Sequence, residues 1–276
     1  MNQISRKITR ALVKLLVLLV ALGAVFPFYW MVVTSLKTSQ EVRAYPPSLF
    51  VTNPRWENYV TVWQSADYLR YLLNSILVTS VILILELTTA ILAGYAYAKV
   101  PFPGKNFFFL ITLMCLMIPS QLRFVPVYVS LSRIGWIDTY LALIVPFAAN
   151  AFSIFLMRQT FMAVPDDYVD AAKIEGANTL QVIWNIMVPM SIPSISALGL
   201  LSFVRHWNEY FWPLVMTTSE KVRTLPLGVA MAKPVEAIQP WHLIMAAGML
   251  LVIPVLVVFG FAQKKLIRAF SYSTLK

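Results

Sequence analysis

The feature that most constrains this chain is a stretch over residues 15–36 that carries no charged side chain, between Lys14 and Lys37. About 20 consecutive apolar residues suffice to cross the hydrocarbon core of a bilayer as a helix. Basic residues precede the stretch and Ala21-Leu22-Gly23 resembles a cleavage site, so a signal peptide is the alternative. The apolar run continues through Val33, which is longer than a typical signal core and favours an uncleaved transmembrane helix.

Five further apolar runs follow along the chain. We predict an all-α polytopic membrane protein with six transmembrane helices, over about residues 11–33, 71–98, 106–130, 138–158, 190–215 and 241–263. Only 12% of the residues are charged, against about a quarter in soluble domains, which argues against a soluble fold. Pro119, Pro146 and Pro254 fall inside predicted helices and are expected to kink them.

Lysine and arginine residues set the predicted orientation, because they accumulate on the cytoplasmic side of a membrane. With the N-terminus inside, the inside segments hold twelve of these residues and the outside segments nine. Both termini are then cytoplasmic in the plasma (inner) membrane, residues 34–70 form an outside loop, and residues 159–190 form a cytoplasmic loop. This topology explains the net charge of +10 better than nucleic-acid binding does.

The predicted cytoplasmic loop begins with the signals of a short helix. Pro165 suits the first turn of a helix, and Asp166 and Asp167 favour the positive N-terminal end of its dipole. Ala171 and Ala172 are strong helix formers. We expect them to provide a slim face that another protein can approach closely.

The same loop continues with a turn and a second helix. Gly176 suits the left-handed position that follows the end of a helix. Asn178 or Thr179 then caps a second helix that runs toward Pro189. The prediction is therefore a helix–turn–helix between two membrane spans.

Asp170-Ala171-Ala172, followed by Gly176 and later by Val188-Pro189, resembles the EAA loop of binding-protein-dependent ABC importers. That loop reads Glu-Ala-Ala, three residues, Gly, and later a hydrophobic–Pro pair, so Asp170 and Val188 keep the chemical type of the usual Glu and Leu. The resemblance implies that a separate ATPase docks here. The implied docking residues are Asp166, Asp167, Asp170, Ala171, Ala172, Glu175, Gly176 and Ala177.

Other motifs extend the resemblance over nearly the whole chain, to the carbohydrate permeases of the maltose-type branch. Within that branch the chain is most similar to the second permease, of the maltose G subunit type. The motifs are Ser35-Leu36-Lys37-Thr38, Asn58-Tyr59, Asn74-Ser75, Pro101-Phe102-Pro103-Gly104-Lys105 and residues 207–214. The tail over residues 269–276 departs from the glycine-rich tail of the family, which reaches toward the ATPase interface.

The resemblance implies one type I importer transmembrane domain over residues 1–276 that works by alternating access. Its implied partners are a second permease subunit, two ATPase domains, an extracytoplasmic solute-binding protein and a sugar or oligosaccharide. The chain has no Gly-x-x-x-x-Gly-Lys-Ser/Thr loop, so we expect no enzymatic activity and no bound cofactor, with ATP-Mg used by the partner ATPase. His206 and His242 have no spacing that predicts a metal site.

Polar residues inside predicted spans are the remaining candidates, because their burial in lipid is costly. Trp207, Asn208 and Glu209 are candidates for the solute pathway, where they would hydrogen-bond and stack on a sugar. The competing interpretation pairs Arg205 with Glu209 at i,i+4 as a structural contact. Both interpretations stay open for Glu209, whereas Arg205 and Glu86 are interpreted as structural charges.

Two other classes of protein compete with an ABC permease. A secondary transporter or channel subunit predicts internal repeats and a charged relay in the membrane, and the sequence shows no clear repeat. A membrane scaffold needs no ordered helix–turn–helix with this pattern. Neighbouring genes for an ATPase, a second permease and a solute-binding protein discriminate between these classes. The sequence does not identify the sugar.

Overall fold

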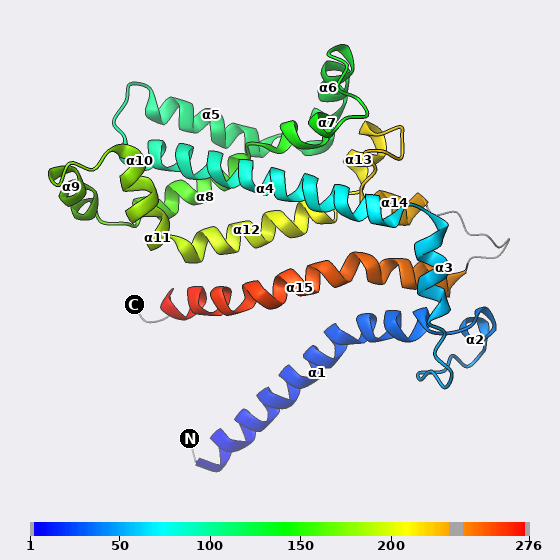
Figure 1. The fold of residues 1–276 in the computed structure, drawn as a ribbon. Helices are drawn as coiled ribbons and strands as arrows, with labels where there is room; N and C mark the ends of the chain where they lie inside the picture. The colour runs from blue at the N-terminus through cyan, green and yellow to red at the C-terminus, as the bar shows by residue number, and fades with distance from the viewer. Residues whose placement is uncertain (1–2, 232–239, 274–276) are drawn as a thin grey trace. The chain divides into compact units, whose positions relative to one another are not determined.

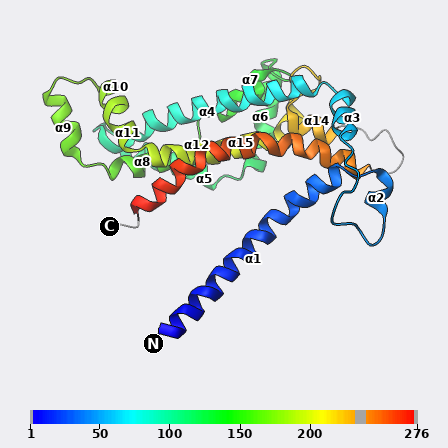
Figure 2. The same cartoon turned by 60° about the horizontal axis from the view of Figure 1, so that its bottom comes forward.

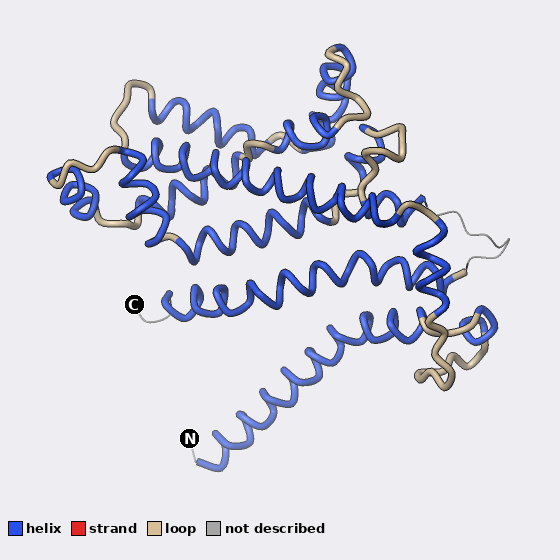
Figure 3. The backbone as a smooth tube through the Cα atoms, viewed as in Figure 1, coloured by secondary structure: helices blue, strands red, loops and turns tan. Residues whose placement is uncertain are grey.

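The computed structural model describes residues 3–231 and 240–273, and within these ranges every regular element is a helix (Figures 1 and 3). Four helices are long and apolar enough to cross a membrane, namely Thr9–Ser35, Tyr68–Lys99, Tyr140–Met162 and Trp241–Phe261. Two sharply bent helix pairs raise the number to six if each pair forms one span. The predicted all-α polytopic class is confirmed. Residues 274–276 of the unusual tail lie outside the described residues.

The chain divides into two compact units. The first contains α1 (Gln3–Ser35), α2 (Ser39–Arg43), α3 (Glu57–Ser65) and the part of α15 (Trp241–Ser273) that ends at Ile253. The loop between α1 and α3 is tied to the end of α1, because the Asn58 side-chain amide donates to the Ser35 and Lys37 carbonyl oxygens at 2.8 and 2.9 Å. The Tyr59 and Ser35 hydroxyl groups lie 2.7 Å apart. These contacts give the Ser35–Thr38 and Asn58-Tyr59 motifs a structural role.

The second unit holds α4 (Tyr68–Lys99) from Leu69 onward, the part of α15 from Pro254, and the helices up to Gly228 in α14. They are α5 (Lys105–Met117), α6 (Ser120–Arg133), α7 (Tyr140–Ile144), α8 (Ala151–Met162), α9 (Asp166–Ile174), α10 (Thr179–Val182), α11 (Val188–Met190), α12 (Ile192–Trp207), α13 (Phe211–Met216) and α14 (Leu225–Met231). A 3₁₀ turn, η1 (Val145–Phe147), follows α7, and a π-helical segment, η2 (Ile183–Met187), precedes α11. In both ribbon views α9 and α10 lie beyond one end of α4, and α14 lies at the other (Figures 1 and 2).

The span predicted over 106–130 contains the kink expected at Pro119, and the structure makes it a full break, because α5 and α6 meet at a bend of 102°. The reason is Pro119, whose ring disfavours helical geometry in the preceding residue. Ile118 accordingly has extended dihedral angles of −85° and 113°.

The single helix predicted over 190–215 is also interrupted. α12 ends at Trp207, the backbone leaves helical geometry at Asn208, and α13 starts at Phe211. At its other end α12 is bent by 83° from the segment Thr179–Met190. Pro193 lies in the first turn of α12. Its missing N–H costs nothing there, because the first N–H groups of a helix have no acceptor within the helix.

The helix predicted over 138–158 is broken in its middle. Pro146 lies in the 3₁₀ turn η1, and Asn150 starts a new helix by accepting hydrogen bonds from the backbone N–H groups of Phe152 and Ser153. The glycine at position 94 lets this second half, α8, approach α4 closely. A Cβ atom at Gly94 would lie 2.7 Å from the Cβ atom of Met157. Small residues at such crossings allow membrane helices to pack backbone against backbone.

The Asn74-Ser75 motif holds a loop near the start of α4. The Asn74 side chain donates to the carbonyl oxygens of Lys221 and Arg223 at 2.9 and 2.8 Å and accepts a hydrogen bond from the Tyr140 hydroxyl group. The Ser75 hydroxyl oxygen accepts from the backbone N–H of Leu225. The loop between α13 and α14 is therefore fixed by side chains whose role the sequence did not reveal.

Candidate functional site: a helix–turn–helix and an intramembrane carboxylate

The loop between α8 and α12 forms the predicted helix–turn–helix. Pro165 precedes the first residue of α9, and the helix ends at Ile174. Gly176 has a φ of +86°, which confirms its predicted left-handed position, and the backbone N–H of Ala177 donates to the Ala172 carbonyl oxygen at 2.9 Å. The turn between the two helices is thus closed by backbone hydrogen bonds.

Asn178 is the residue that caps the second helix. Its side chain accepts from the backbone N–H of Gln181 at 2.9 Å, while the Gln181 side chain accepts from the backbone N–H of Asn178 at 2.8 Å. Such a reciprocal capping box satisfies two backbone donors at the start of a helix. The local sequence therefore determines where α10 begins.

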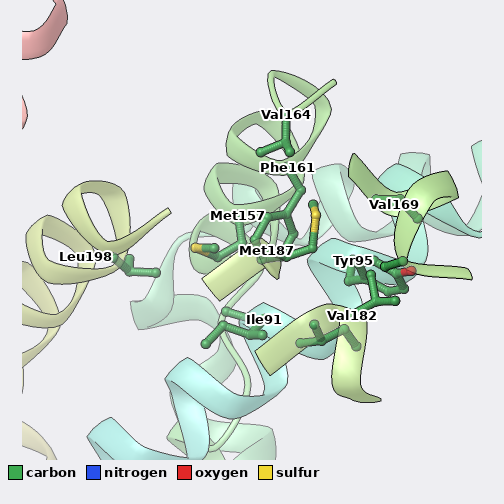
Figure 4. Close-up of a cluster of buried hydrophobic side chains, with 12 residues drawn as sticks. Ile91, Tyr95, Met157, Phe161, Val164, Val169, Val182, Met187 and Leu198 are labelled. Atoms are coloured by element: carbon green, nitrogen blue, oxygen red, sulfur yellow. The ribbon is translucent and has the colours of Figure 1, made fainter. Parts of the chain in front are cut away.

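One face of α9 packs into a hydrophobic core that α4, α8, η2 and α12 share. Figure 4 shows Val169 of α9 near Tyr95 of α4 and Val182 of α10, within a cluster that also contains Phe161 and Met187. This packing fixes α9 against the ends of the membrane helices rather than leaving it as a free loop.

The slim alanine face predicted for α9 is only half correct, because the two alanines point in different directions. Ala172 belongs to the hydrophobic core and is 8% exposed, whereas Ala171 is exposed. A helix turns 100° per residue, so neighbouring positions cannot share a face. Of the predicted docking residues, the exposed ones are Asp166, Asp167, Asp170, Ala171, Glu175 and Gly176, and Ala177 is half-buried.

The two alanines provide a matched pair of substitutions. We expect Ala172→Leu to destabilise the chain by about 1–3 kcal/mol, because a larger side chain overpacks the core. Ala171→Leu, which adds the same atoms to an exposed position, should leave stability within about 0.5 kcal/mol of the wild type. Thermal unfolding of the two purified variants in the same detergent measures the difference. Equal losses of stability would contradict the assignment of Ala172 to the core.

Lys99, the last residue of α4, anchors the start of the helix–turn–helix. Its ammonium group donates to the Val164 carbonyl oxygen at 2.7 Å and to the Asp166 carboxylate. The Lys99 side chain is buried and Asp166 is exposed. The hydrogen bond from Lys99 holds the pKa of Asp166 below its ordinary value. Sequence reasoning missed this contact, because nothing in the local pattern pairs residues so far apart.

Large hydrophobic side chains remain exposed on the helix–turn–helix. Before the final turn of the segment they are Tyr168, Ile174, Leu180 and Trp184, and Ile174 is 88% exposed. Tyr168 and Ile174 lie close in the sequence to exposed acidic residues of α9 and its C-cap, whereas Leu180 and Trp184 follow the turn. Exposed hydrophobic side chains that gather on one ordered segment are typical of a protein interaction surface. We call these four residues the loop surface; the sequence pattern did not single them out.

The second polar site surrounds Glu86, whose side chain is 1% exposed in the middle of α4. Its carboxylate accepts from the hydroxyl groups of Ser153 in α8 and Ser202 in α12. The Arg205 guanidinium lies 3.2 and 3.3 Å from its two oxygens, and the His206 ring lies 3.2 Å away. One carboxylate thus joins three membrane helices.

The predicted i,i+4 pair between Arg205 and Glu209 is wrong, since Arg205 pairs with Glu86 instead. Glu209 lies beyond the end of α12, where the spacing of a helix no longer applies. Its carboxylate accepts from the backbone N–H of Trp212 at 3.0 Å at the start of α13. Glu209 also lines a cavity of about 20 Å³, with His206 and Trp212 in its wall, which has room for about one water molecule and none for a sugar.

The structure separates the other two candidates for the pathway. Trp207 is buried and stacks on Phe203 with ring centres 5.6 Å apart, so it presents no free ring face in this conformation. Asn208 is exposed, and its side chain donates to the Val204 carbonyl oxygen at 2.8 Å. Of the three predicted pathway residues, Asn208 is exposed, Glu209 is half-buried and Trp207 is buried.

These helices and this loop define an integral membrane component of a transport system. Residues 86–272 match the family model described as binding-protein-dependent transport system inner membrane component, and the chain belongs to that family. It is a multi-pass permease subunit of an ABC importer, which confirms the class predicted from the EAA-type loop. The alternatives of a secondary transporter or a scaffold lose their support.

Curated relatives agree with this family. The chain is 32% identical over 252 residues to the sn-glycerol-3-phosphate transport system permease protein UgpE of Yersinia pestis bv. Antiqua, covering 88% of this chain and 89% of the relative. The UgpE protein of Escherichia coli O1:K1 is 32% identical over 250 residues, with the same coverage.

Solved structures agree with the fold. A chain of a bacterial ABC transporter involved in the import of the acidic polysaccharide alginate superposes with a TM-score of 0.84 at 23% identity, over 96% of this chain and 98% of the other. A second structure is a bacterial alginate ABC transporter in complex with an alginate pentasaccharide-bound periplasmic protein. One of its chains superposes with a TM-score of 0.61 at 17% identity, over 95% of this chain and 96% of the other.

Proposed function

We propose that the helix–turn–helix over residues 165–190 is the site through which a separate ATPase drives this permease. The observation that carries the proposal is the division of α9 into two faces. Val169 and Ala172 are fixed in the core of the membrane helices, while Ile174 and its exposed neighbours have no cover within the described part of the chain. A docked ATPase would cover the exposed face, and its motion would pass through the packed face to α4, α8 and α12.

The proposed docking places this loop and both termini in the cytoplasm, as the lysine and arginine counts predict. The energy for transport then comes from ATP-Mg bound by the partner, and this chain is a non-catalytic subunit. The absence of an ATP-binding loop in the sequence supports this assignment.

The remaining proposed partners are a second permease subunit, which supplies the other half of the pathway, and a solute-binding protein outside. A pathway shared between two subunits is consistent with the exposed polar side chains at the end of α12, Arg205 and the C-cap residue Asn208. The proposed solute is a sugar or a related polyol. Support comes from the family motifs and from the relative UgpE, whose name assigns it to the transport of sn-glycerol 3-phosphate.

A crosslinking experiment tests the docking directly. A cysteine introduced at position 174, in a chain whose native Cys115 is replaced by serine, should form a short bifunctional crosslink with the partner ATPase in the assembled transporter. A cysteine introduced in place of Glu220, which is exposed in the loop between α13 and α14, is the matched control and should give no such product. Crosslinks at position 220 and none at position 174 would contradict the proposal.

A further inference from the structure

Arg205 lies at a depth where exposure of a charged group to lipid is strongly disfavoured. Its partner Glu86 is thirteen residues before Lys99 in the continuous helix α4. At 1.5 Å per residue this places Glu86 about 20 Å from the end of the helix, well inside a hydrocarbon core about 30 Å thick. The Arg205 guanidinium, within 3.3 Å of that carboxylate, lies at the same level.

Arg205 is nevertheless far from buried within this chain. Its side chain is 48% exposed, while the Glu86 side chain is 1% exposed. Leu201 and Val204 of α12 and its C-cap residue Asn208 are exposed with it, at spacings of three and four residues that follow one side of the helix. Because a guanidinium that faces lipid at this depth is strongly disfavoured, this face of α12 adjoins protein or water in the assembled transporter.

The contact with Glu86 leaves part of the guanidinium available. Nη2 alone approaches the two Glu86 oxygens and the His206 ring. Among the described residues Nε and Nη1 donate no hydrogen bond, so their three N–H groups remain open to a ligand. Glu86 therefore stabilises the charge and fixes its position without occupying all its donors.

The other titratable groups nearby are directed elsewhere. His206 is buried against Glu86, and the Glu209 carboxylate accepts from the backbone at the start of α13. Within the described residues Arg205 is thus the exposed cation on this face of α12, beside the amide of Asn208.

We propose that Arg205 is an anion-recognition residue of the solute pathway, which contacts a carboxylate or phosphate group carried by the transported solute. The inference rests on the proposed permease function and adds to it a chemical class of solute. A carboxylate of the second permease subunit could supply the same anionic contact to Arg205. The two sources are distinguished by whether position 208 is accessible to reagents in water.

The test measures the local potential in the complete complex. Asn208→Cys is introduced with Cys115→Ser, and the complex is exposed to two methanethiosulfonate reagents of similar size, one sulfonated and anionic, one trimethylammonium and cationic. Rates are measured at rest and after trapping with ATP and vanadate. If Arg205 faces the pathway, adding Arg205→Gln should lower about tenfold the ratio of the anionic reagent's rate to the cationic reagent's rate. Size-exclusion chromatography first confirms that the variant complex assembles, because the substitution removes the counter-charge of the buried Glu86. Arg133→Gln, which removes an exposed arginine at the end of α6, is the matched control and should not change the ratio.

Each other outcome overturns the inference. Suppose that the cysteine at position 208 reacts with neither reagent in either state, while a cysteine at position 220, in the loop after α13, does react. The second permease then seals this face. Suppose instead that the cysteine at position 208 reacts, but that the ratio of anionic to cationic reaction rates is the same with and without Arg205. The guanidinium then does not attract anions at this position. Neither outcome affects the proposed ATPase docking, which the crosslink at position 174 tests separately.

Discussion

Replacing Ile174 by aspartate should lower the affinity of the ATPase for this permease at least about tenfold while the permease itself stays folded. Ile174 is 88% exposed in the free chain, so the substitution removes no internal packing. Burial of an isoleucine side chain in an interface contributes about 1.5–3 kcal/mol, and burial of an unpaired carboxylate adds a further cost. The measurement is ATPase binding to the permease in nanodiscs, with solute uptake by the complete transporter as the second readout.

Two controls make the Ile174 result interpretable. Ile174→Leu keeps the apolar surface and should retain binding within about threefold, because isosteric apolar exchanges cost little. Glu175→Gln changes the charge of the adjacent exposed residue and separates an electrostatic effect from an apolar one. Full ATPase binding and uptake by Ile174→Asp would show that the loop surface is not the docking site.

Replacing Glu86 by leucine should destabilise the permease by at least about 3 kcal/mol. The substitution removes the acceptor of two buried hydroxyl groups, Ser153 and Ser202, and the counter-charge of Arg205. Loss of one partner of such a pair is more costly than loss of both, because it leaves an uncompensated charge in a low-dielectric region. Thermal unfolding of the purified chain in one detergent provides the measurement.

The double variant distinguishes a charge pair from a packing effect at Glu86. Glu86→Leu with Arg205→Leu should regain part of the stability that Glu86→Leu alone loses. Glu86→Gln, which keeps the shape and one acceptor oxygen, should fall between the wild type and Glu86→Leu. A wild-type unfolding temperature for Glu86→Leu would exclude a stabilising role for the carboxylate.

Much of the loop could be predicted because its signals are local. Pro165, Gly176 and Asn178 each act on the backbone within a few residues, and the structure places the helix start, the left-handed turn and the second cap at those positions. The sequence predicts kinks at Pro119 and Pro146, but not their size. A proline weakens a helix locally, whereas the angle depends on what packs on either side of it.

The directions in which individual side chains point were harder to predict from the sequence. The spacing of Ala171 and Ala172 predicted a shared slim face, yet only packing against Tyr95, Val182 and their neighbours shows that Ala172 points inward. Likewise Arg205 and Glu209 fit a helical pair until the end of α12 at Trp207 separates them. Both errors came from extending a helical rule without knowing what surrounds the helix.

The sequence by itself determined the membrane class, the approximate spans and the helix–turn–helix, because hydrophobic length and backbone preferences depend on neighbouring residues alone. Only the tertiary structure decided that Lys99 holds Asp166, that Glu86 holds Arg205, and which side of α9 is exposed. The residues in these contacts are far apart in the sequence: Lys99 and Asp166 are separated by 67 positions, and Glu86 and Arg205 by 119. A local pattern carries no information about such partners, since their proximity follows from how the helices pack.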